Sequence, residues 1–238
     1  MEYYEIKVTL LLKKDIRLEN INEFISFNIN KSMISDAELK KSHGSKGFKP
    51  YCIGSLYPFD LENKIYRANQ IYILTIRSID KDFLNKLKNV LKQSKDLDFN
   101  VLACQFMKKT YSFIESAFTL TPCIISITNE ESKKTRYWTK DDSSLDFVKK
   151  RIKANLEKKY FQFYYEKIIA PDDFISMIEI KNRIPIVYNY KKSKLFSNKF
   201  KITFNSDVIS QKLAFLAFGV GLLEKNSLGF GFLTKGKE

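Results

Sequence analysis

Short stretches of the chain alternate between apolar and polar residues, which is the period of a β-strand with one buried face. Residues 4–12 show this pattern best, since every second residue is apolar, and residues 97–103 repeat it. Residues 48–57 and 71–76 also resemble strands and are separated by a turn-rich segment. The first half of the chain is therefore expected to contain four strands.

Apolar residues spaced three or four positions apart predict two helices among these strands. The first follows Asn20, which can cap it while Glu23 completes a capping box, and the second begins at Asp80. The resulting order is strand, helix, strand, strand, helix, strand. This is the ferredoxin-like unit, whose four-stranded sheet is a common RNA-binding platform.

The second half follows the same plan less regularly. A glycine cap suits a helix end, so its last helix is expected to stop at Gly219. We predict an α+β fold of two tandem ferredoxin-like (βαββαβ, RRM-like) domains, residues 1–110 and 111–238, with a glycine-rich loop near the C-terminus. Helices are expected from Ser143 and Asp207, and strands at 113–120, 124–128, 174–180, 185–190, 200–204 and 230–233.

Composition narrows the functional class. The 238 residues carry a formal net charge of +14 at pH 7, and 44% of them are hydrophobic, so a mostly disordered chain is excluded. Clustered lysine and arginine attract polyanions such as RNA, DNA or an acidic membrane surface, while a solvated lysine-rich surface is the alternative. The three cysteines are odd in number and widely spaced, which predicts buried free thiols in a reducing cytoplasm.

Few residues are suited to bind a metal, because the chain has one histidine and no paired cysteines. No metal and no cofactor is therefore expected. The N-terminus lacks the apolar core of a signal peptide, and no apolar run approaches the length of a membrane span. A cytoplasmic protein without a membrane partner is the resulting prediction.

Seven of the eight glycines fall into two short segments. Residues 219–231 hold four of them, in two Gly-x-Gly pairs around the polar insert Glu224-Lys-Asn-Ser227. Glycine adopts positive φ readily and lets another chain approach closely, and consecutive backbone N–H groups can form a phosphate-binding nest. We therefore predict a binding loop here, with a tight turn that needs glycine only for its geometry as the alternative.

The other glycine-rich segment surrounds His43. Gly44 and Gly47 predict a loop, and the neighbouring lysines are unusual company for a buried histidine. Imidazole titrates near neutral pH, so His43 is the natural candidate for acid and base chemistry. The alternative is a structural histidine.

These two segments resemble motifs of the Cas6 family of CRISPR RNA-processing endoribonucleases. The ending Gly219-Val-Gly-Leu-Leu-Glu-Lys-Asn-Ser-Leu-Gly-Phe-Gly is similar to the family's C-terminal glycine-rich motif. Residues 42–55, with a histidine and a lysine six residues later, are similar to its N-terminal catalytic segment. The resemblance implies two ferredoxin-like folds facing across a cleft, with CRISPR repeat RNA as the substrate.

RNA can be cut without a metal when its own 2′-OH attacks the adjacent phosphate, giving a 2′,3′-cyclic phosphate and a 5′-OH. We expect His43 to take the 2′-OH proton or to protonate the leaving 5′ oxygen. Lys49 is expected to stabilise the charge that builds on phosphorus. A solubilising lysine at a strand edge is the alternative for Lys49.

The chain departs from the family at one position. Well-known members carry a tyrosine in the helix before the histidine, and the matching residue here is Phe27, which has no proton to give. Tyr51 and Asn28 are candidates for the missing role. Otherwise the enzyme positions its RNA for in-line attack by binding alone, and weak activity is expected.

Basic residues gather between Lys181 and Lys201, where no acidic residue occurs and Tyr188, Tyr190 and Phe196 are interleaved. Cations that hold the backbone and rings that stack on bases are typical of an RNA-binding surface. A solvated hairpin is the alternative. The residues expected to bind RNA, here and in the two motifs, are Lys46, Arg183, Lys191, Lys192, Lys194, Gly221, Lys225, Asn226, Ser227 and Gly229.

The sequence thus predicts a metal-independent endoribonuclease that cuts CRISPR repeat RNA (pre-crRNA), with His43 and Lys49 as its catalytic residues. A non-catalytic repeat-RNA-binding protein of the same fold is the alternative, which Phe27 favours. A general single-stranded nucleic-acid binder is a third interpretation. Whether the chain joins other Cas proteins in an interference complex, or forms a homodimer, is left open.

Overall fold

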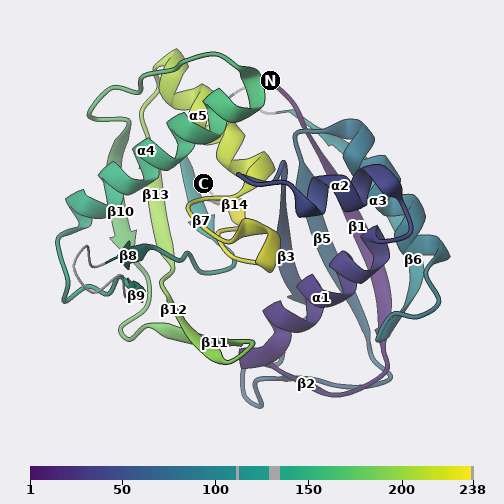
Figure 1. Ribbon diagram of the computed structural model, residues 1–238. Coiled ribbons are helices and arrows are strands. Elements are labelled where there is room, and N and C mark those ends of the chain that lie inside the picture. Colours follow the sequence, from purple (N-terminus) through teal and green to yellow (C-terminus); the bar gives the residue numbers. More distant parts are fainter. Residues whose placement is uncertain (111–112, 129–134, 237–238) are drawn as a thin grey trace.

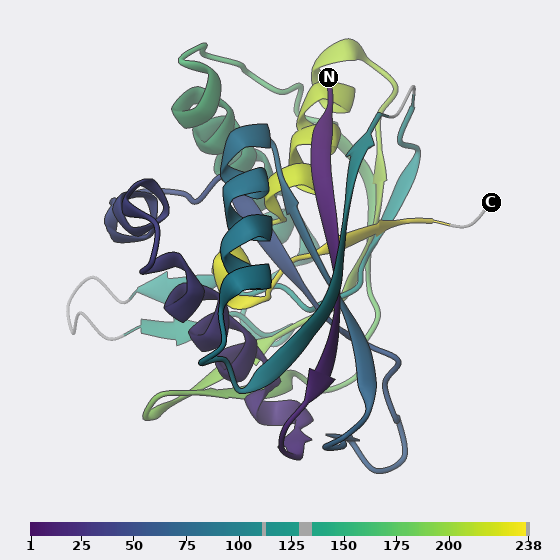
Figure 2. The same ribbon diagram turned by 90° about the vertical axis from the view of Figure 1, so that its right-hand side faces the viewer.

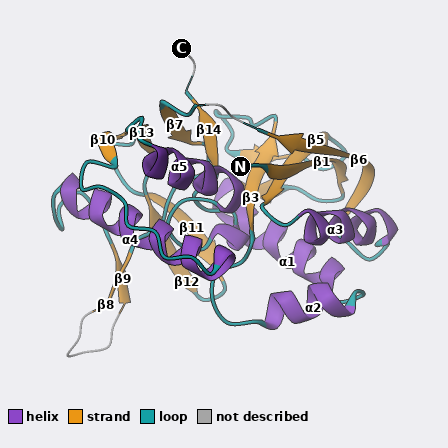
Figure 3. Cartoon of the chain, turned by 90° about the horizontal axis from the view of Figure 1, so that it is seen from above, coloured by secondary structure: helices purple, strands orange, loops and turns teal. Residues whose placement is uncertain are grey.

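Two four-stranded antiparallel sheets organise the protein, whose computed structural model describes residues 1–110, 113–128 and 135–236 (Figure 1). Seen from above, the strands of both sheets lie along one side of the molecule and the main helices along the other (Figure 3). The helices thus cover one face of each sheet, and α5 (Val208–Val220) of the second half contacts strands of both sheets.

The first sheet has the strand order β3-β5-β1-β6. Figure 2 shows β1 beside β6, with the helices of this half to the left of the two strands. Helix α2 follows directly on α1, and α3 connects β5 to β6. The bounds are β1 (Tyr3–Leu12), α1 (Ile21–Met33), α2 (Ala37–Gly44), β3 (Tyr51–Tyr57), β5 (Ile71–Ser78), α3 (Lys81–Gln93) and β6 (Phe99–Lys109).

The predicted alternation explains how this sheet buries one face. Ile6 of β1 pairs with Ile76 of β5, and both side chains are fully buried. Helix α3 begins where expected, because the Asp80 carboxylate accepts a hydrogen bond from the Phe83 N–H at 2.9 Å and caps the helix. The local pattern therefore decides both the strand and the helix that packs on it.

The second sheet has the order β10-β13-β7-β14. Counted within each half, both sheets follow the order second, third, first, fourth strand, which is the ferredoxin-like arrangement. The prediction of an α+β fold with two tandem ferredoxin-like units is confirmed. The bounds are β7 (Ser116–Thr119), α4 (Leu145–Tyr164), β10 (Ile175–Ile180), β13 (Phe200–Phe204), α5 (Val208–Val220) and β14 (Leu233–Lys235).

Three two-stranded pairs and two 3₁₀ helices complete the described part of the chain. The predicted strands at 124–128 and 185–190 belong to these pairs, not to the main sheet, because each folds back on a neighbouring segment. The pairs are β2 (Ile16–Arg17) with β4 (Ile65–Tyr66), β8 (Ser126–Thr128) with β9 (Thr135–Tyr137), and β11 (Ile186–Tyr190) with β12 (Ser193–Ser197); the 3₁₀ helices are η1 (Leu18–Asn20) and η2 (Asn226–Leu228).

Two predicted helix caps are wrong. Asn20 precedes α1, but its carboxamide oxygen accepts a hydrogen bond from the Asn189 side chain at 2.9 Å instead of capping the helix. Ser143 accepts a hydrogen bond from the Trp138 indole at 2.9 Å, and α4 begins only at Leu145. Asn20 is thus engaged by a residue far away in the sequence, and Ser143 by an indole only five residues earlier.

Gly219 lies inside α5 and does not end it. A Cβ at this position would come within 2.7 Å of Ile79 Cγ2 and 3.1 Å of Tyr3 Cβ, so glycine is needed for α5 to approach the first half. The helix ends at Val220, and Gly221 follows with a φ of +81°. The expected glycine cap therefore stands two residues later than predicted.

Side chains cross between the halves to complete each hydrophobic core. Tyr3 packs in the core of the second half, whereas Tyr188 and Phe230 pack in the core of the first. Arg77 of β5 donates hydrogen bonds to Glu5 Oε2 at 2.8 Å and to the backbone carbonyl of residue 233 at 2.7 Å. The predicted domain boundary near residue 110 falls between β6 and β7 and stays a prediction.

Candidate functional site

His43 lies in the last turn of α2, so the prediction of a loop at this residue is wrong. The Asp36 carboxylate caps the helix by accepting hydrogen bonds from the N–H groups of Glu38 at 3.0 Å and Leu39 at 2.9 Å. Gly44 is the last residue of the helix and does not interrupt it. The imidazole of His43 is exposed to solvent, where a polyanion can reach it.

The side chain of Lys49 folds back onto the end of this helix. Its ammonium donates hydrogen bonds to the backbone carbonyls of Ser42 at 2.8 Å, His43 at 2.8 Å and Ser45 at 2.6 Å. These carbonyls belong to the helix C-terminus, where a cation is favoured, and burial lowers the pKa of Lys49. The two predicted catalytic residues therefore lie together, joined through the backbone of His43.

The segment between them is held by helix α4. Gln162 accepts a hydrogen bond from the Phe48 N–H at 2.9 Å and donates one to the Phe48 carbonyl at 2.7 Å. Gly47 has a φ of +98°, and a Cβ there would lie 2.6 Å from Gln162 Oε1. Glycine at 47 therefore permits α4 to approach this closely, while Lys46 stays exposed beside it.

Because α5 includes Gly219 and Val220, the glycine-rich loop comprises residues 221–231, and it is folded around Asn226. The carboxamide nitrogen of Asn226 donates hydrogen bonds to the carbonyls of Leu222 and Phe230, both at 2.9 Å, and Asn226 is 8% exposed. The structure thus gives Asn226 an internal place, whereas the sequence predicts an RNA contact. Lys225 and Ser227 are half-buried and remain accessible at the surface.

The loop glycines use their N–H groups within the protein. The N–H of Gly221 bonds to the carbonyl of Ala217 at 2.9 Å, that of Gly229 to Asn226 at 3.1 Å and that of Gly231 to Pro122 at 2.9 Å. These donors are therefore not free to form the phosphate nest that the sequence suggests. Positive φ at all three glycines instead serves the loop's compact turn geometry.

Lys159 of α4 is a buried lysine that the sequence pattern does not single out. Its ammonium is 1% exposed and donates hydrogen bonds to the Gly221 carbonyl at 2.8 Å, the Leu223 carbonyl at 2.9 Å and Asn226 Oδ1 at 2.7 Å. Burial lowers the pKa of Lys159 to about 7. The signal lay in the helix period, because position 159 falls three residues after the buried Leu156.

The loop also contacts the first half of the chain. Its 3₁₀ helix η2 packs against β3 and α1, and the Asn22 side chain of α1 donates a hydrogen bond to the Gly229 carbonyl at 3.3 Å. On the other side, Glu224 accepts hydrogen bonds from the Ser126 hydroxyl at 2.6 Å and from Arg151 of α4 at 3.1 Å. The loop is thus fixed between both halves.

The candidates for the missing tyrosine role have other places. Phe27 is 58% exposed on α1. Asn28 is fully buried, and its carboxamide bonds to the Phe24 carbonyl at 2.9 Å and to the Asp98 N–H at 2.8 Å. Tyr51 is 1% exposed, and burial raises its pKa. Neither Asn28 nor Tyr51 presents a proton donor at the surface.

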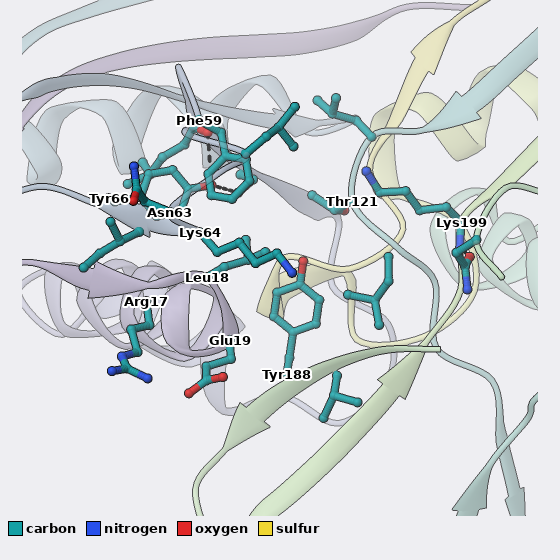
Figure 4. A pocket seen from close by; sticks show the side chains of 18 of the residues that line it. Arg17, Leu18, Glu19, Phe59, Asn63, Lys64, Tyr66, Thr121, Tyr188 and Lys199 are labelled. Atoms are coloured by element: carbon teal, nitrogen blue, oxygen red, sulfur yellow. Dashed lines mark hydrogen bonds between the residues drawn. The ribbon is translucent and has the colours of Figure 1, made fainter. Parts of the chain in front are cut away.

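A cavity of about 1020 Å³ opens between the two halves. In Figure 4, Lys64 and Lys199 approach it from different sides, with Tyr188 between them. Lys199 is partly buried, which lowers its pKa. Among the described residues, the lining contains one acidic side chain, Glu19, and five basic ones: Arg17, Lys64, Arg67, Arg183 and Lys199.

The predicted basic stretch forms the β11–β12 hairpin beside this cavity. Lys191, Lys192 and Lys194 are exposed at its turn. Tyr188 is buried and packs edge-on against Phe230, with 5.4 Å between ring centroids, so it is not available to stack on a base. The hairpin thus supplies cations, while two of its three aromatic rings, Tyr188 and Tyr190, pack on the core of the first half.

Three further properties follow from the described part of the chain. No group of three or more His, Cys, Asp or Glu side chains in it is arranged to hold a metal ion. None of its helices combines the length and apolar character that crossing a membrane requires. The cysteines Cys52, Cys104 and Cys123 are unpaired, as predicted, but Cys104 is only partly buried, unlike the other two.

Comparisons with known proteins agree with this fold. The family described as "CRISPR associated protein Cas6, C-terminal" matches residues 105–234, more than half of the chain. A Methanocaldococcus jannaschii protein named "CRISPR-associated endoribonuclease Cas6 2" is 26% identical over 241 residues, covering 96% of this chain and 98% of that protein.

Two solved structures are similar over nearly their whole length. "An RAMP protein binding different RNA substrates" has a TM-score of 0.75 and 19% identity, with 100% of both chains covered. The structure titled "Characterization of a Cas6-related gene from Pyrococcus furiosus" has a TM-score of 0.74 and 19% identity, covering 99% of this chain and 98% of that one. With the family match over residues 105–234, the chain belongs to the Cas6 family of CRISPR-associated proteins.

Proposed function

We propose that this chain is an endoribonuclease that cuts CRISPR repeat RNA (pre-crRNA) without a metal. The M. jannaschii relative is named an endoribonuclease, and one structural relative is titled as binding RNA. The observation that carries the proposal is the exposed imidazole of His43 at the end of α2, with the ammonium of Lys49 held against the same helix end. An acid–base group and a cation thus share one accessible site.

The chemistry requires one proton transfer at each end of an in-line displacement. His43 removes the 2′-OH proton, the bond from the 2′ oxygen to phosphorus forms, and the bond from phosphorus to the 5′ oxygen breaks. A proton from solvent completes the 5′-OH, and the other product is a 2′,3′-cyclic phosphate. Lys49 supplies positive charge to the phosphorane, exchanging one of its backbone acceptors for a phosphate oxygen.

The RNA strand is bound by cations of both halves. The cavity brings Lys64 of the first half close to Lys199 of the second, and the hairpin adds Lys191, Lys192 and Lys194. Arg183 lines the cavity, and Lys46, Lys225 and Ser227 extend the polar surface near the catalytic segment and the loop. Backbone phosphates are the natural ligands of such a surface.

A non-catalytic repeat-RNA-binding protein is the second candidate function. Phe27 favours it, because no hydroxyl stands where related enzymes carry a tyrosine. The engagement of Lys49 with three backbone carbonyls also favours it, since an ammonium already bonded in this way is less available to a phosphate.

Incubation of the purified protein with labelled repeat RNA in EDTA separates the two functions. An endoribonuclease shortens the RNA and leaves a 2′,3′-cyclic phosphate, whereas a binding protein only retards it in a gel. His43→Ala is expected to abolish cleavage and to keep binding. Lys40→Ala, an exposed substitution on the same helix, is the control and is expected to cleave like the wild type. Undiminished cleavage by His43→Ala would remove His43 from the mechanism.

Two finer expectations belong to this proposal. The unpaired cysteines are consistent with a reducing cytoplasm as the site of action. Association with other Cas proteins and formation of a homodimer both stay open. Light scattering during size-exclusion chromatography, with and without repeat RNA, tests the homodimer.

A further inference from the structure

Helix α4 carries two polar side chains on its inner face that contact different parts of the site. Lys159 and Gln162 are three residues apart, so they lie on the same side of the helix. Lys159 contacts the glycine-rich loop, and Gln162 contacts the segment that joins His43 to Lys49. One rigid element therefore touches both motifs.

The contacts of Lys159 match its chemistry. An ammonium has three N–H donors, and each meets one oxygen of the loop: the carbonyls of Gly221 and Leu223, and Oδ1 of Asn226. Because Asn226 in turn bonds to Leu222 and Phe230, the loop closes around this side chain. Lys159 thus fixes where the loop stands along α4.

The contacts of Gln162 fix the catalytic segment in the same way. Its amide meets both polar groups of Phe48, the N–H at 2.9 Å and the carbonyl at 2.7 Å, so it sets both the position and the orientation of the peptide next to Lys49. The ring of Phe48 lies 5.6 Å from the Lys159 ammonium, a cation–π distance. Loop, helix and catalytic segment thus meet in a single cluster.

We propose that Lys159 and Gln162 are positioning residues that hold the glycine-rich loop and the His43–Lys49 segment in a fixed relative position for RNA cleavage. The inference rests on the proposed endoribonuclease function. Neither residue needs to touch RNA, since both act through the backbone of other residues. A small displacement of reacting groups is costly in such a site, on the order of 100-fold in rate for about 1 Å.

Gln162→Ala tests the second contact, and the chain offers a matched control. Gln211 of α5 makes the same pair of hydrogen bonds to Ile114: it accepts one from the Ile114 N–H at 2.8 Å and donates one to the Ile114 carbonyl at 3.0 Å. Both residues lie outside the two motifs. We expect Gln162→Ala to lower the single-turnover cleavage rate at saturating protein on the order of 10- to 100-fold. Its affinity for repeat RNA should stay within about 2-fold, whereas Gln211→Ala should cleave like the wild type.

Each outcome decides the inference. Equal cleavage rates for Gln162→Ala and the wild type, or an equal loss in both glutamine variants, would overturn the role of Gln162. The proposed function is judged separately by His43→Ala: if that variant is inactive while Gln162→Ala is fully active, only the positioning inference fails. If His43→Ala cleaves normally, the proposed mechanism itself fails.

Lys159→Met tests the first contact with a readout besides cleavage. It keeps the length of the side chain and removes all three donors. Hydrogen exchange at residues 221–231 is expected to accelerate at least about 10-fold, while β1 exchanges as in the wild type. Unchanged exchange in the loop would contradict the role of Lys159, and the Gln162 variants keep the inference testable if Lys159→Met does not fold.

Discussion

The Lys49 ammonium lies 2.8 Å from the carbonyl oxygen of His43. The two residues are connected through a backbone carbonyl at the C-terminus of α2, where the last carbonyls have no N–H partner within the helix. Lys49 therefore closes the helix that carries His43, in addition to any charge that it offers a phosphate. Changes at position 49 should affect both the end of the helix and the reaction.

Lys49→Ala is expected to lower the single-turnover cleavage rate on the order of 100-fold or more, because it removes a cation from the reacting phosphate and loosens the helix end that carries His43. Hydrogen exchange should also accelerate at residues 42–45, whose carbonyls lose their donor. Lys40→Ala, an exposed substitution on the same helix, is the control for rate and exchange together. A full cleavage rate in Lys49→Ala would exclude a catalytic role.

The buried ammonium of Lys159 predicts how stability depends on pH. Its pKa is about 7 in the folded protein against an ordinary value of 10.5, so above pH 7 the unfolded chain binds a proton that the folded chain has released. The free energy of unfolding should therefore rise from pH 7 to 8.5 through this group. Cys52, Cys123 and Glu224 act on the ammonium electrostatically and partly oppose the lowering of its pKa, and burial raises the pKa of the two thiols to about 12, so they titrate above this range in the folded state.

The measurement is urea unfolding of the wild type and of Lys159→Met at both pH values. The rise should be smaller in the variant, since it lacks the titrating group, and Lys158→Met, an exposed neighbour, should behave like the wild type. The same pH dependence in all three proteins would show that Lys159 stays protonated throughout.

The cavity between the halves predicts a salt-dependent effect on RNA affinity. Lys199→Ala and Arg183→Ala should each weaken repeat-RNA binding and reduce the slope of log K against log salt by about 1, because each removes one phosphate contact. Fluorescence anisotropy over a range of salt concentrations measures both quantities. Lys95→Ala changes an exposed lysine that does not line the cavity and should alter neither. Equal slopes for all variants would place the RNA elsewhere.

Substitution of Arg77 is expected to cause a large loss of stability. Its side chain is buried, is paired with Glu5 at 2.8 Å and lies 4.2 Å from the Phe232 ring centroid. Arg77→Met leaves the Glu5 carboxylate without its main partner and should lower the free energy of unfolding by about 3–5 kcal/mol. Arg67→Met breaks an exposed pair with Asp15 and should cost at most about 1 kcal/mol. Similar losses in the free energy of unfolding of the two variants would mean that the buried pair contributes no more to stability than the exposed one.

Elements with a local cause could be predicted from the sequence. The alternation in β1 and the apolar stripe of α3 each depend on neighbouring residues, so both were predictable. The helix that carries His43 was not, because Gly44 and Gly47 suggest a loop, although Asp36 supplies a helix cap that the sequence also contains. Here two local signals compete, and the cap decides the structure up to Gly44.

Contacts between residues far apart in the chain could not be predicted from the sequence. Asn20 meets Asn189, which is 169 positions away, and its predicted role as a cap fails for that reason. Lys64 and Lys199, from different halves of the chain, line the same cavity. The residue that holds Phe48 by hydrogen bonds is Gln162, which comes 114 positions later. The two motifs were found from their glycines and their resemblance to a family, but the helix that holds them could be identified only in the structure.

The exchange of side chains between the two hydrophobic cores limits how the chain can be divided. Tyr3 completes the interior of the second half, and Tyr188 and Phe230 complete that of the first. A gene cut between β6 and β7 would yield two fragments, each missing part of its own interior. Expressed separately, the fragments should aggregate. Expressed together, they should associate, and recovery of RNA cleavage would then measure that association.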